Sequence, residues 1–329
     1  MKVLYIGGTG NISTASSKLA VEQGIELWHL NRGITRVEIP GVNTITANIY
    51  DVEETRKALE EHTWDVVVNW IAFIPEHIHN DVELFRGKTK QYIFISSASV
   101  YQKPPSFPII TESTPLYNPH WAYSRDKIDC ENKLMETYQN TGFPITIVRP
   151  SHTYHNKIPL TIGGWSEYTV IDRMRKGQPV IIQGDGTSLW TLTHADDFAK
   201  GFNGLLGNVR SIGHAVHITS DEVLTWNQIY EVTASAVGVD LNAVHITSDF
   251  ISNIVPGEKD GLWGDKSHCA IFDNAKIKSL VPGFNATIPF SEGIKRTLAW
   301  FEAEPSRMEI KPETNAMMNK ILNAYSQLG

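Results

Sequence analysis

Tyr123 and Lys127 stand four residues apart, and Ser97 closes an apolar run earlier in the chain. The apolar stripe of segment 124–138 predicts a helix, so the tyrosine and the lysine would share one face, one turn apart. A free phenol has a pKa of about 10, and a neighbouring cation lowers it by favouring the phenolate. With a serine hydroxyl to orient a substrate oxygen, this set could take a proton from an alcohol while a nicotinamide accepts the hydride. A surface Tyr/Lys pair is the alternative interpretation.

A glycine-rich turn near the N-terminus indicates where a nicotinamide dinucleotide would be held. The run GGTGNIS at residues 7–13 follows a predicted strand, 3–6, and opens a predicted helix, 11–23. It fits G-x-x-G-x-x-[small] and G-x-G-x-x-[small], with Ser13 in place of the usual third glycine. Such glycines allow a tight turn and a close approach to a pyrophosphate, which the helix N-terminus attracts. An ordinary glycine turn is the alternative.

The end of the second predicted strand, 25–30, bears on the choice of dinucleotide. An acidic residue at this point binds the ribose 2′-hydroxyl of NAD, whereas an arginine accommodates the 2′-phosphate of NADP. Here the strand is followed by Asn31 and Arg32, without an acid. The sequence therefore favours NADP, with NAD as the alternative cofactor. A solvated loop arginine is the other interpretation of Arg32.

Further apolar runs, separated by helical stretches, indicate one large sheet. They occupy residues 44–47, 64–72, 91–95 and 144–150. Continuous apolar strands are typical of a parallel sheet covered on both faces. We expect an α/β protein with a Rossmann-type doubly wound parallel sheet in residues 1–158, plus parts of 180–220. Residues 159–329 would mainly form a smaller C-terminal α/β substrate lobe with C-terminal helices.

Ligands of such folds bind at the carboxyl ends of the strands, and the candidate residues gather there. The expected cofactor contacts are Gly7, Gly10, Asn11, Ile12, Asn31, Arg32, Asn48, Ile49, Trp70, Ile71, Ala72, Lys127 and Pro150. The expected substrate contacts are Phe73, Ser99, His152, Trp165 and Trp190. Aromatic rings can stack on the apolar face of a sugar, and core packing is the alternative for each ring.

Together these motifs resemble the extended short-chain dehydrogenases/reductases of the NAD-dependent epimerase/dehydratase family. The matching segments are 7–13, 68–72, 95–101, 123–127, 148–150, 184–187 and 193–199. The resemblance implies that Tyr123 is the acid/base and that Ser97 binds the reacting oxygen. It implies that Lys127 lowers the tyrosine pKa and contacts the nicotinamide ribose. A homodimer is a further expectation from this family.

Four positions depart from the family pattern. Asn31 and Asn48 stand where acids are common, and His152 stands where nucleotide-sugar enzymes usually carry asparagine. No arginine follows the turn at 184–186. Two expected contacts to a nucleotide diphosphate are therefore missing. The chain also resembles the atypical branch that includes chloroplast stem-loop RNA-binding proteins.

The resemblance implies an NAD(P)-dependent epimerase or oxidoreductase that acts on a hydroxyl-bearing carbon of a sugar or sugar derivative through a keto intermediate. A dehydratase ranks last, because residues 97–99 (Ser-Ala-Ser) lack the acid pair that usual dehydratases place after this serine. The alternative is a non-catalytic dinucleotide-binding or RNA-associated protein on the same fold, since fold alone does not give function.

Composition narrows the expected partners to small molecules. The 329 residues include 29 basic and 36 acidic side chains, a net charge of −7, so nucleic acid is not expected as a partner. No apolar run is long enough for a membrane span, and two cysteines outside any CxxC pair fit a reducing cytoplasm. The pairs His77-x-His79 and His152-x-x-His155 lack further ligands in suitable spacing, so no metal is expected.

Overall fold

The computed structural model describes residues 1–34 and 37–328. Its centre is a seven-stranded parallel sheet in the order β12-β7-β5-β4-β1-β2-β3. The strands are β1 (Lys2–Ile6), β2 (Glu26–Asn31), β3 (Asn43–Thr46), β4 (Val66–Asn69), β5 (Tyr92–Ile95), β7 (Ile145–Pro150) and β12 (His214–Ile218). The strand order reverses between β1 and β4, which confirms the predicted Rossmann-type doubly wound sheet.

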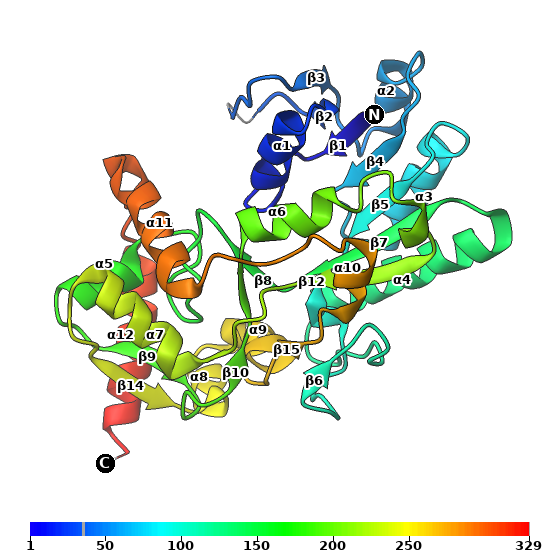
Figure 1. Cartoon of the computed structure of the whole chain (residues 1–329). Helices are drawn as coiled ribbons and strands as arrows, with labels where there is room; N and C mark the ends of the chain where they lie inside the picture. The colour runs from blue at the N-terminus through cyan, green and yellow to red at the C-terminus, as the bar shows by residue number, and fades with distance from the viewer. Residues whose placement is uncertain (35–36, 329) are drawn as a thin grey trace.

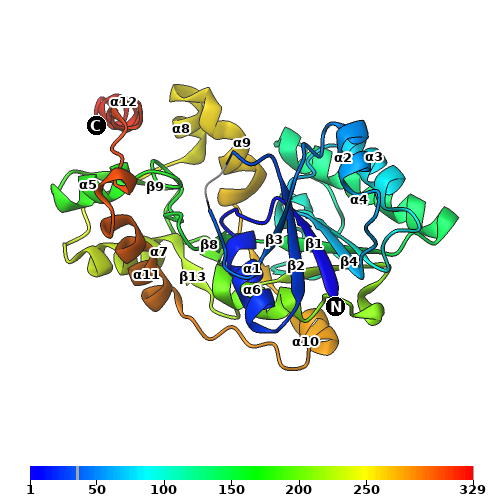
Figure 2. The same cartoon turned by 90° about the horizontal axis from the view of Figure 1, so that it is seen from above.

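Helices cover both faces of this sheet (Figure 2). One face carries α1 (Ser13–Glu22), α6 (Ala195–Asn203) and α10 (Ala275–Leu280). The other face carries α2 (Val52–Ala58), α3 (Pro75–Phe85) and α4 (Ala122–Thr141). Strands β4, β5 and β7 are buried along their whole length, which explains why their sequences are almost continuously apolar. Their carboxyl ends meet at one edge of the sheet.

The edge strand β12 was not predicted from the sequence. Its sequence, HAVHI, contains two histidines that obscure the apolar pattern. His217 is buried because both ring nitrogens have partners, with Nδ1 2.9 Å from the Tyr101 hydroxyl and Nε2 2.8 Å from the Asp273 carbonyl. The central sheet thus includes a strand from beyond residue 158. The exact domain boundary stays a prediction.

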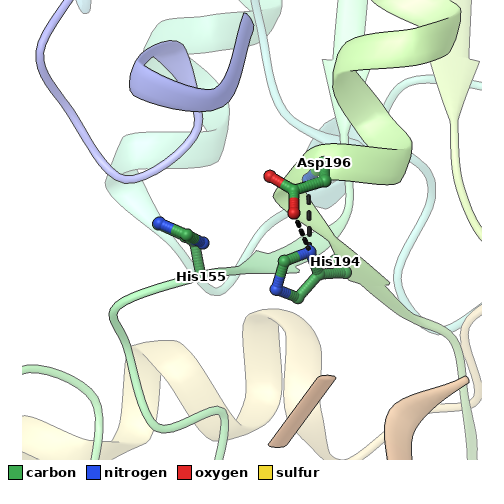
Figure 3. Close-up of side chains that lie close together, drawn as sticks. All are labelled: His155, His194 and Asp196. Carbon is green, nitrogen blue, oxygen red and sulfur yellow. Dashed lines mark hydrogen bonds and ion pairs between the residues drawn. The ribbon is translucent and has the colours of Figure 1, made fainter. Parts of the chain in front are cut away.

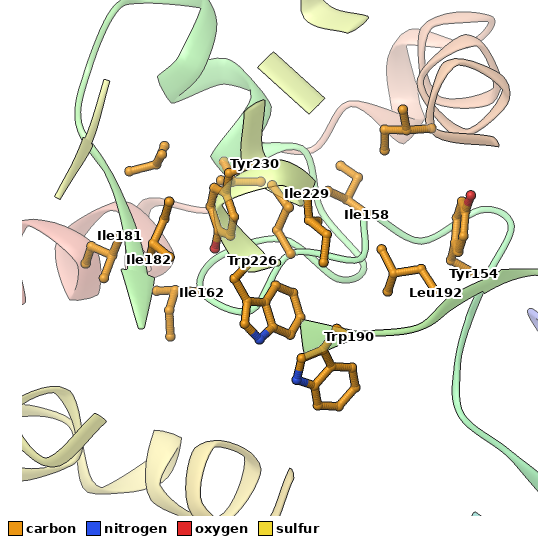
Figure 4. Close-up of a cluster of buried hydrophobic side chains, with 14 of the residues drawn as sticks. Tyr154, Ile158, Ile162, Ile181, Ile182, Trp190, Leu192, Trp226, Ile229 and Tyr230 are labelled. Carbon is orange, nitrogen blue, oxygen red and sulfur yellow. The ribbon is translucent and has the colours of Figure 1, made fainter. Parts of the chain in front are cut away.

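Most of the remaining chain forms the lobe on the left of Figure 1. Its main elements are α5 (Thr169–Arg175), β9 (Val180–Gln183), α7 (Trp226–Val237), β14 (Ala243–Ile246), α8 (Ser248–Ile254), α11 (Phe290–Glu302) and α12 (Pro312–Ser326). Short strand pairs supplement them: β8 (His152–Tyr154) with β11 (Leu192–His194), β10 (Leu189–Trp190) with β13 (Leu224–Thr225), and β6 (Ile109–Ile110) with β15 (Ile271–Phe272). Aromatic and branched side chains fill the lobe core (Figure 4), where the Trp190 and Trp226 ring centroids lie 5.2 Å apart.

The helix ends follow local signals. Thr225 caps α7 as predicted, since its hydroxyl accepts the Gln228 N–H at 3.1 Å while the Gln228 side chain accepts the Thr225 N–H at 2.9 Å. Helix α4 is longer than the predicted 124–138 and ends at Gly142, which has a φ of +72°. None of the helices in the described part of the chain combines the length and the hydrophobicity needed to span a bilayer.

Candidate active site

The glycine turn packs so closely against its surroundings that side chains are excluded from it. Gly7 has a φ of +82°, and a Cβ at Gly8 would lie 2.3 Å from Nε2 of the buried His29. Ser13 closes the turn, because its hydroxyl donates to the Gly7 carbonyl at 3.0 Å and accepts the Gly10 N–H at 2.8 Å. This double contact explains how a serine replaces the usual third glycine. The turn leads into α1, an arrangement that suits a pyrophosphate.

A cavity of about 420 Å³ lies beside the glycine turn. Seven predicted cofactor contacts line it: Gly7, Gly10, Asn31, Arg32, Asn48, Ile49 and Ile71. The Asn31 side-chain oxygen accepts the Gly33 N–H at 3.0 Å, so the asparagine shapes the turn that carries Arg32. Among the described residues, no acidic side chain lines this cavity. Five further lining residues were not among the predicted contacts: Thr9, Leu30, Ile34, Ala47 and Tyr50.

A larger cavity, of about 770 Å³, shares Gly7, Gly10, Ile71 and Phe73 with the first and extends across the carboxyl ends of β5 and β7. The predicted residues on its wall are Gly7, Gly10, Asn11, Ile12, Trp70, Ile71, Phe73, Ser97, Ser99, Tyr123, Lys127, Pro150, His152 and Trp165. They converge because parallel strands end at one edge of the sheet. The sequence reasoning missed wall residues from the C-terminal lobe, among them Leu160, Thr161, Glu258, Leu262, Asp265 and Lys266. No motif marks them.

Two predicted contacts do not line either cavity. Ala72 is fully buried, and its carbonyl accepts a hydrogen bond from Lys127 instead. Trp190 is only 1% exposed, and its indole N–H donates to the His268 carbonyl at 2.8 Å. The predicted substrate contact of Trp190 was therefore wrong. Its ring belongs to the lobe core (Figure 4) and supports His152, with the two ring centroids 5.8 Å apart.

Lys127 is held by backbone carbonyls at the floor of the larger cavity. Its Nζ donates to the Ala72 carbonyl at 2.6 Å and to the Ile95 carbonyl at 2.8 Å. The rings of Phe73 and Phe94 each lie 4.8 Å from the same atom. Burial lowers the pKa of Lys127 to about 8. Because an ammonium has three donors, one N–H is left for a ligand in the cavity.

The surroundings of Tyr123 favour its protonated form. Burial raises the pKa of Tyr123 above its ordinary value, a hydrogen bond with Ser97 opposes that rise, and the nearby Asp265 carboxylate adds to it. The Lys127 Nζ lies 5.7 Å from the centre of the tyrosine ring, and the expectation that Lys127 lowers this pKa stays a prediction. A protonated phenol can donate its proton to a carbonyl oxygen.

A chain of hydroxyl groups positions Ser97. Its Oγ accepts the Ser99 N–H at 3.2 Å, at the start of the short 3₁₀ turn Ala98–Val100, and lies 2.9 Å from the Ser99 Oγ. The Ser99 Oγ in turn accepts the hydroxyl of Ser124 at 2.8 Å. Ser124 directly follows Tyr123 on α4. The segment after β5 and the start of α4 are therefore linked beside Ser97 and Tyr123.

A buried ion pair holds α4 against the sheet. The Arg149 guanidinium on β7 donates through Nε to the Glu131 carboxylate at 2.9 Å, and both side chains are at most 5% exposed. Glu131 lies one turn beyond Lys127 on the same helix. Arg149, which belongs to one of the family-like segments, thus fixes the helix that carries Tyr123 and Lys127.

His152 is a neutral histidine on the cavity wall. Burial and the nearby Lys266 lower the pKa of His152 well below its ordinary value. Its Nε2 has no hydrogen-bond partner in the part of the chain that the structure describes. A neutral imidazole nitrogen can donate or accept one hydrogen bond with a substrate, depending on the tautomer. The predicted substrate contact of His152 agrees with this position and stays a prediction.

Three potential metal ligands that the sequence did not bring together, His155, His194 and Asp196, lie close to one another (Figure 3). One ligand atom of each lies within 4.8 Å of the others. However, the His194 Nδ1 accepts the Asp196 N–H at 3.2 Å and so caps α6, while Arg296 approaches the Asp196 carboxylate to 3.8 Å. The helix cap and the arginine account for this cluster, and the expectation of no metal stays a prediction.

A family comparison matches most of the region that carries these features. The family model described as "NAD dependent epimerase/dehydratase family" matches residues 3–219. Its span includes the glycine turn, the serine that ends β5, the Tyr/Lys pair of α4 and the edge strand β12.

Two curated proteins resemble the chain at low identity. The chloroplast stem-loop binding protein of 41 kDa b from Arabidopsis thaliana is 25% identical, with 72% of this chain and 63% of that protein covered. The chain thus spans less than two thirds of that relative. The 2′-dehydrokanamycin reductase of Streptomyces kanamyceticus is 22% identical, with 86% of this chain and 80% of that protein covered.

Solved structures show the same fold. The dTDP-glucose 4,6-dehydratase of Bacillus anthracis, in complex with NAD, superposes with a TM-score of 0.74 over 93% of this chain and 98% of that one. The two sequences are 18% identical, so the likeness concerns the fold alone.

Proposed function

The chain belongs to the NAD-dependent epimerase/dehydratase family, and we propose that it is an enzyme acting on a hydroxyl-bearing carbon of a sugar or sugar derivative. The observation that carries the proposal is the convergence of Tyr123, Lys127 and Ser97 on the cavity that also contains the glycine turn. When bound, a nicotinamide would supply the hydride exchange at that carbon. The chain's own side chains would supply the proton transfer and the orientation.

Each of the three residues has one role in this proposal. Tyr123 holds a proton on its phenol oxygen and donates it to a substrate carbonyl, or accepts it back from the hydroxyl. Ser97 orients the same substrate oxygen through its hydroxyl, since both residues line the same cavity. Lys127 uses its third N–H to hold the ribose of the dinucleotide. An oxidoreductase or an epimerase would follow, and the reductase among the relatives supports the first of these by its name.

We propose NADP as the preferred cofactor, with NAD as the alternative. Arg32 lines the smaller cavity, and no carboxylate of the described residues is present there to bind a ribose 2′-hydroxyl. The close approach of the glycine turn to His29, together with the Ser13 contacts, suits a dinucleotide pyrophosphate. NAD in the complex of the Bacillus anthracis dehydratase favours the alternative. A homodimer also stays a prediction.

A second candidate function is a non-catalytic, RNA-associated protein on the same fold. The name of the Arabidopsis relative favours it. The net charge of −7 counts against it, because RNA binding normally uses a basic surface.

The experiment that tests the enzyme proposal substitutes the acid/base. Purified protein is mixed with NAD⁺ or NADP⁺ and a panel of sugars and sugar derivatives, with reduced cofactor followed by absorbance and product stereochemistry by NMR. We expect Tyr123→Phe to lower the turnover number by about 10²–10⁴-fold, the usual range for loss of a general acid/base, without weakening cofactor binding.

Tyr117→Phe provides the matched control, because Tyr117 is 57% exposed and lies outside the described cavity walls. It should leave turnover unchanged. Full turnover in Tyr123→Phe would contradict the proposed role. Cofactor binding without any turnover of the panel would favour the non-catalytic candidate.

A further inference from the structure

The wall of the larger cavity that faces the catalytic side chains is built from the C-terminal lobe. It includes a one-turn π-helix, Leu262–Lys266, a feature that often marks functional sites. The Asn118 side-chain amide ties this turn to the catalytic edge, because it donates to the Gly264 carbonyl at 2.7 Å and to the Ser99 carbonyl at 2.8 Å. A Cβ at Gly264 would lie 2.7 Å from the Trp121 Cβ, so the turn is packed tightly in place.

The charged groups on this cavity wall do not suit a second diphosphate. Among the described residues, the wall carries two ammonium groups, Lys127 and Lys266, two carboxylates, Glu258 and Asp265, and no guanidinium. Lys127 already donates hydrogen bonds to two backbone carbonyls. The Lys266 Nζ already contacts the Asp265 carboxylate at 2.5 Å and lies 4.3 Å from a Trp190 ring centroid.

A diphosphate placed here would therefore meet only ammonium groups that already have partners. Transfer of a doubly charged group from water into such a cavity is costly unless charged donors replace the water. Proteins usually supply those donors as arginines, which bind phosphates through two parallel hydrogen bonds. The glycine turn and the N-terminus of α1 can serve one diphosphate, that of the dinucleotide.

The same wall is well supplied with groups for neutral or amine-bearing ligands. The Asp265 carboxylate is held between Lys266 and the buried Lys103, whose Nζ lies 3.6 Å away. Asp265 lines the same cavity as Tyr123, which places the carboxylate near the proposed reacting centre. Two buried polar atoms of the wall, the Ser96 Oγ and the His152 Nε2, have no hydrogen-bond partner in the described part of the chain. Sugar hydroxyl groups could pair with all of these.

We propose that the substrate is a sugar that carries no phosphate, and that Asp265 and Glu258 recognise its hydroxyl or amino groups. This inference rests on the proposed function for the reaction but concerns only what the cavity binds. It distinguishes the chain from enzymes that hold a sugar through an attached nucleoside diphosphate.

The test measures the binding of UDP-glucose to the whole protein saturated with NADP⁺ or NAD⁺, whichever binds more tightly. We expect no saturation of the unmodified protein up to about 1 mM UDP-glucose. Glu258→Arg should tighten UDP-glucose binding by about tenfold or more, because it adds a charge-assisted partner for phosphate. Glu231→Arg, at an exposed site on α7 outside the cavity, makes the same charge change and should have no effect. Thermal unfolding confirms that each variant is folded.

Saturation of the unmodified protein at micromolar UDP-glucose would overturn the inference. Failure of Glu258→Arg to exceed Glu231→Arg would also count against it, since the missing cation would then not be the cause.

Turnover separates this inference from the proposed function. Glucose, glucosamine and UDP-glucose are compared in the unmodified protein and in Tyr123→Phe. Turnover of a phosphate-free sugar that depends on Tyr123 supports both proposals, and Asp265→Asn should then raise KM by about tenfold with a smaller change in kcat. Tyr123-dependent turnover of UDP-glucose would support the function and overturn the inference. Saturable binding of a phosphate-free sugar without turnover would support the inference and contradict the function.

Discussion

At the residue scale, the burial of Lys127 affects both the stability of the folded protein and the proposed binding of the cofactor. Its pKa of about 8 lies below the ordinary value of 10.5 because burial disfavours the ammonium form. The folded protein therefore releases this proton at a lower pH than the unfolded chain does. The contribution of Lys127 to the free energy of unfolding should rise as the pH rises from about 8 to 10.5.

Cofactor binding should show the opposite dependence on pH. Only the ammonium form carries a third N–H for the dinucleotide, so affinity should fall as the pH rises through about 8. Lys127→Met should bind more weakly and lose this dependence. Dissociation constants from fluorescence quenching on both sides of that pH provide the measurement. An affinity of the unmodified protein that stays constant across this range would show that Lys127 is not the cofactor contact.

Arg32 gives the second prediction at the residue scale. Arg32→Gln should weaken NADP binding by about tenfold, through loss of one charge-assisted hydrogen bond to the 2′-phosphate. NAD binding should not change. Titrations of both dinucleotides make the comparison, with Arg56→Gln as the control, since Arg56 pairs with Glu53 and lies outside the described cavities. An equal loss of affinity for NAD and NADP would contradict the proposed preference.

At the scale of elements, α4 is the helix on which the site depends. It carries Tyr123 and Lys127, and the Glu131–Arg149 ion pair fixes it to β7. A buried ion pair adds little to the free energy of unfolding compared with an apolar pair of similar size. Removal of one partner, however, leaves an uncompensated charge in the interior.

Glu131→Gln should therefore lower the free energy of unfolding by about 3 kcal/mol, because the Arg149 charge would stay buried without its carboxylate. Glu136→Gln on the same helix is the control. Glu136 and its partner Lys133 are 62% and 47% exposed, so its loss should cost less than about 0.5 kcal/mol. Urea unfolding of the three proteins measures the difference. Equal stability of the two variants would mean that the buried pair does not anchor α4.

At the scale of the whole molecule, the charge distribution separates the two candidate functions. The chain has 29 basic and 36 acidic side chains. It therefore lacks the excess of positive charge with which proteins bind the phosphate backbone of RNA. We expect no retention of a stem-loop RNA in filter-binding assays at low salt. Binding that weakens steeply as salt is added would instead support the RNA-associated candidate.

The sheet and the cofactor turn could be predicted from the sequence because their signals are local. Apolar runs, the glycine spacing of residues 7–13 and the Tyr/Lys spacing of α4 each occupy one short segment. The doubly wound topology then brings Ser97 and Tyr123 to one edge of the sheet. The edge strand β12 was missed because two histidines interrupt its apolar pattern, and the partners that allow His217 to be buried come together only in the folded protein.

The sequence by itself determined the fold class and most of the candidate residues at the carboxyl ends of the strands. Only the tertiary structure decided their surroundings. It placed Trp190 in the lobe core, buried Tyr123 so that its pKa rises, and brought Asp265 and Lys266 to the cavity wall. Burial, ionisation and a shared cavity depend on segments that are distant in the chain, so no local pattern of residues records them.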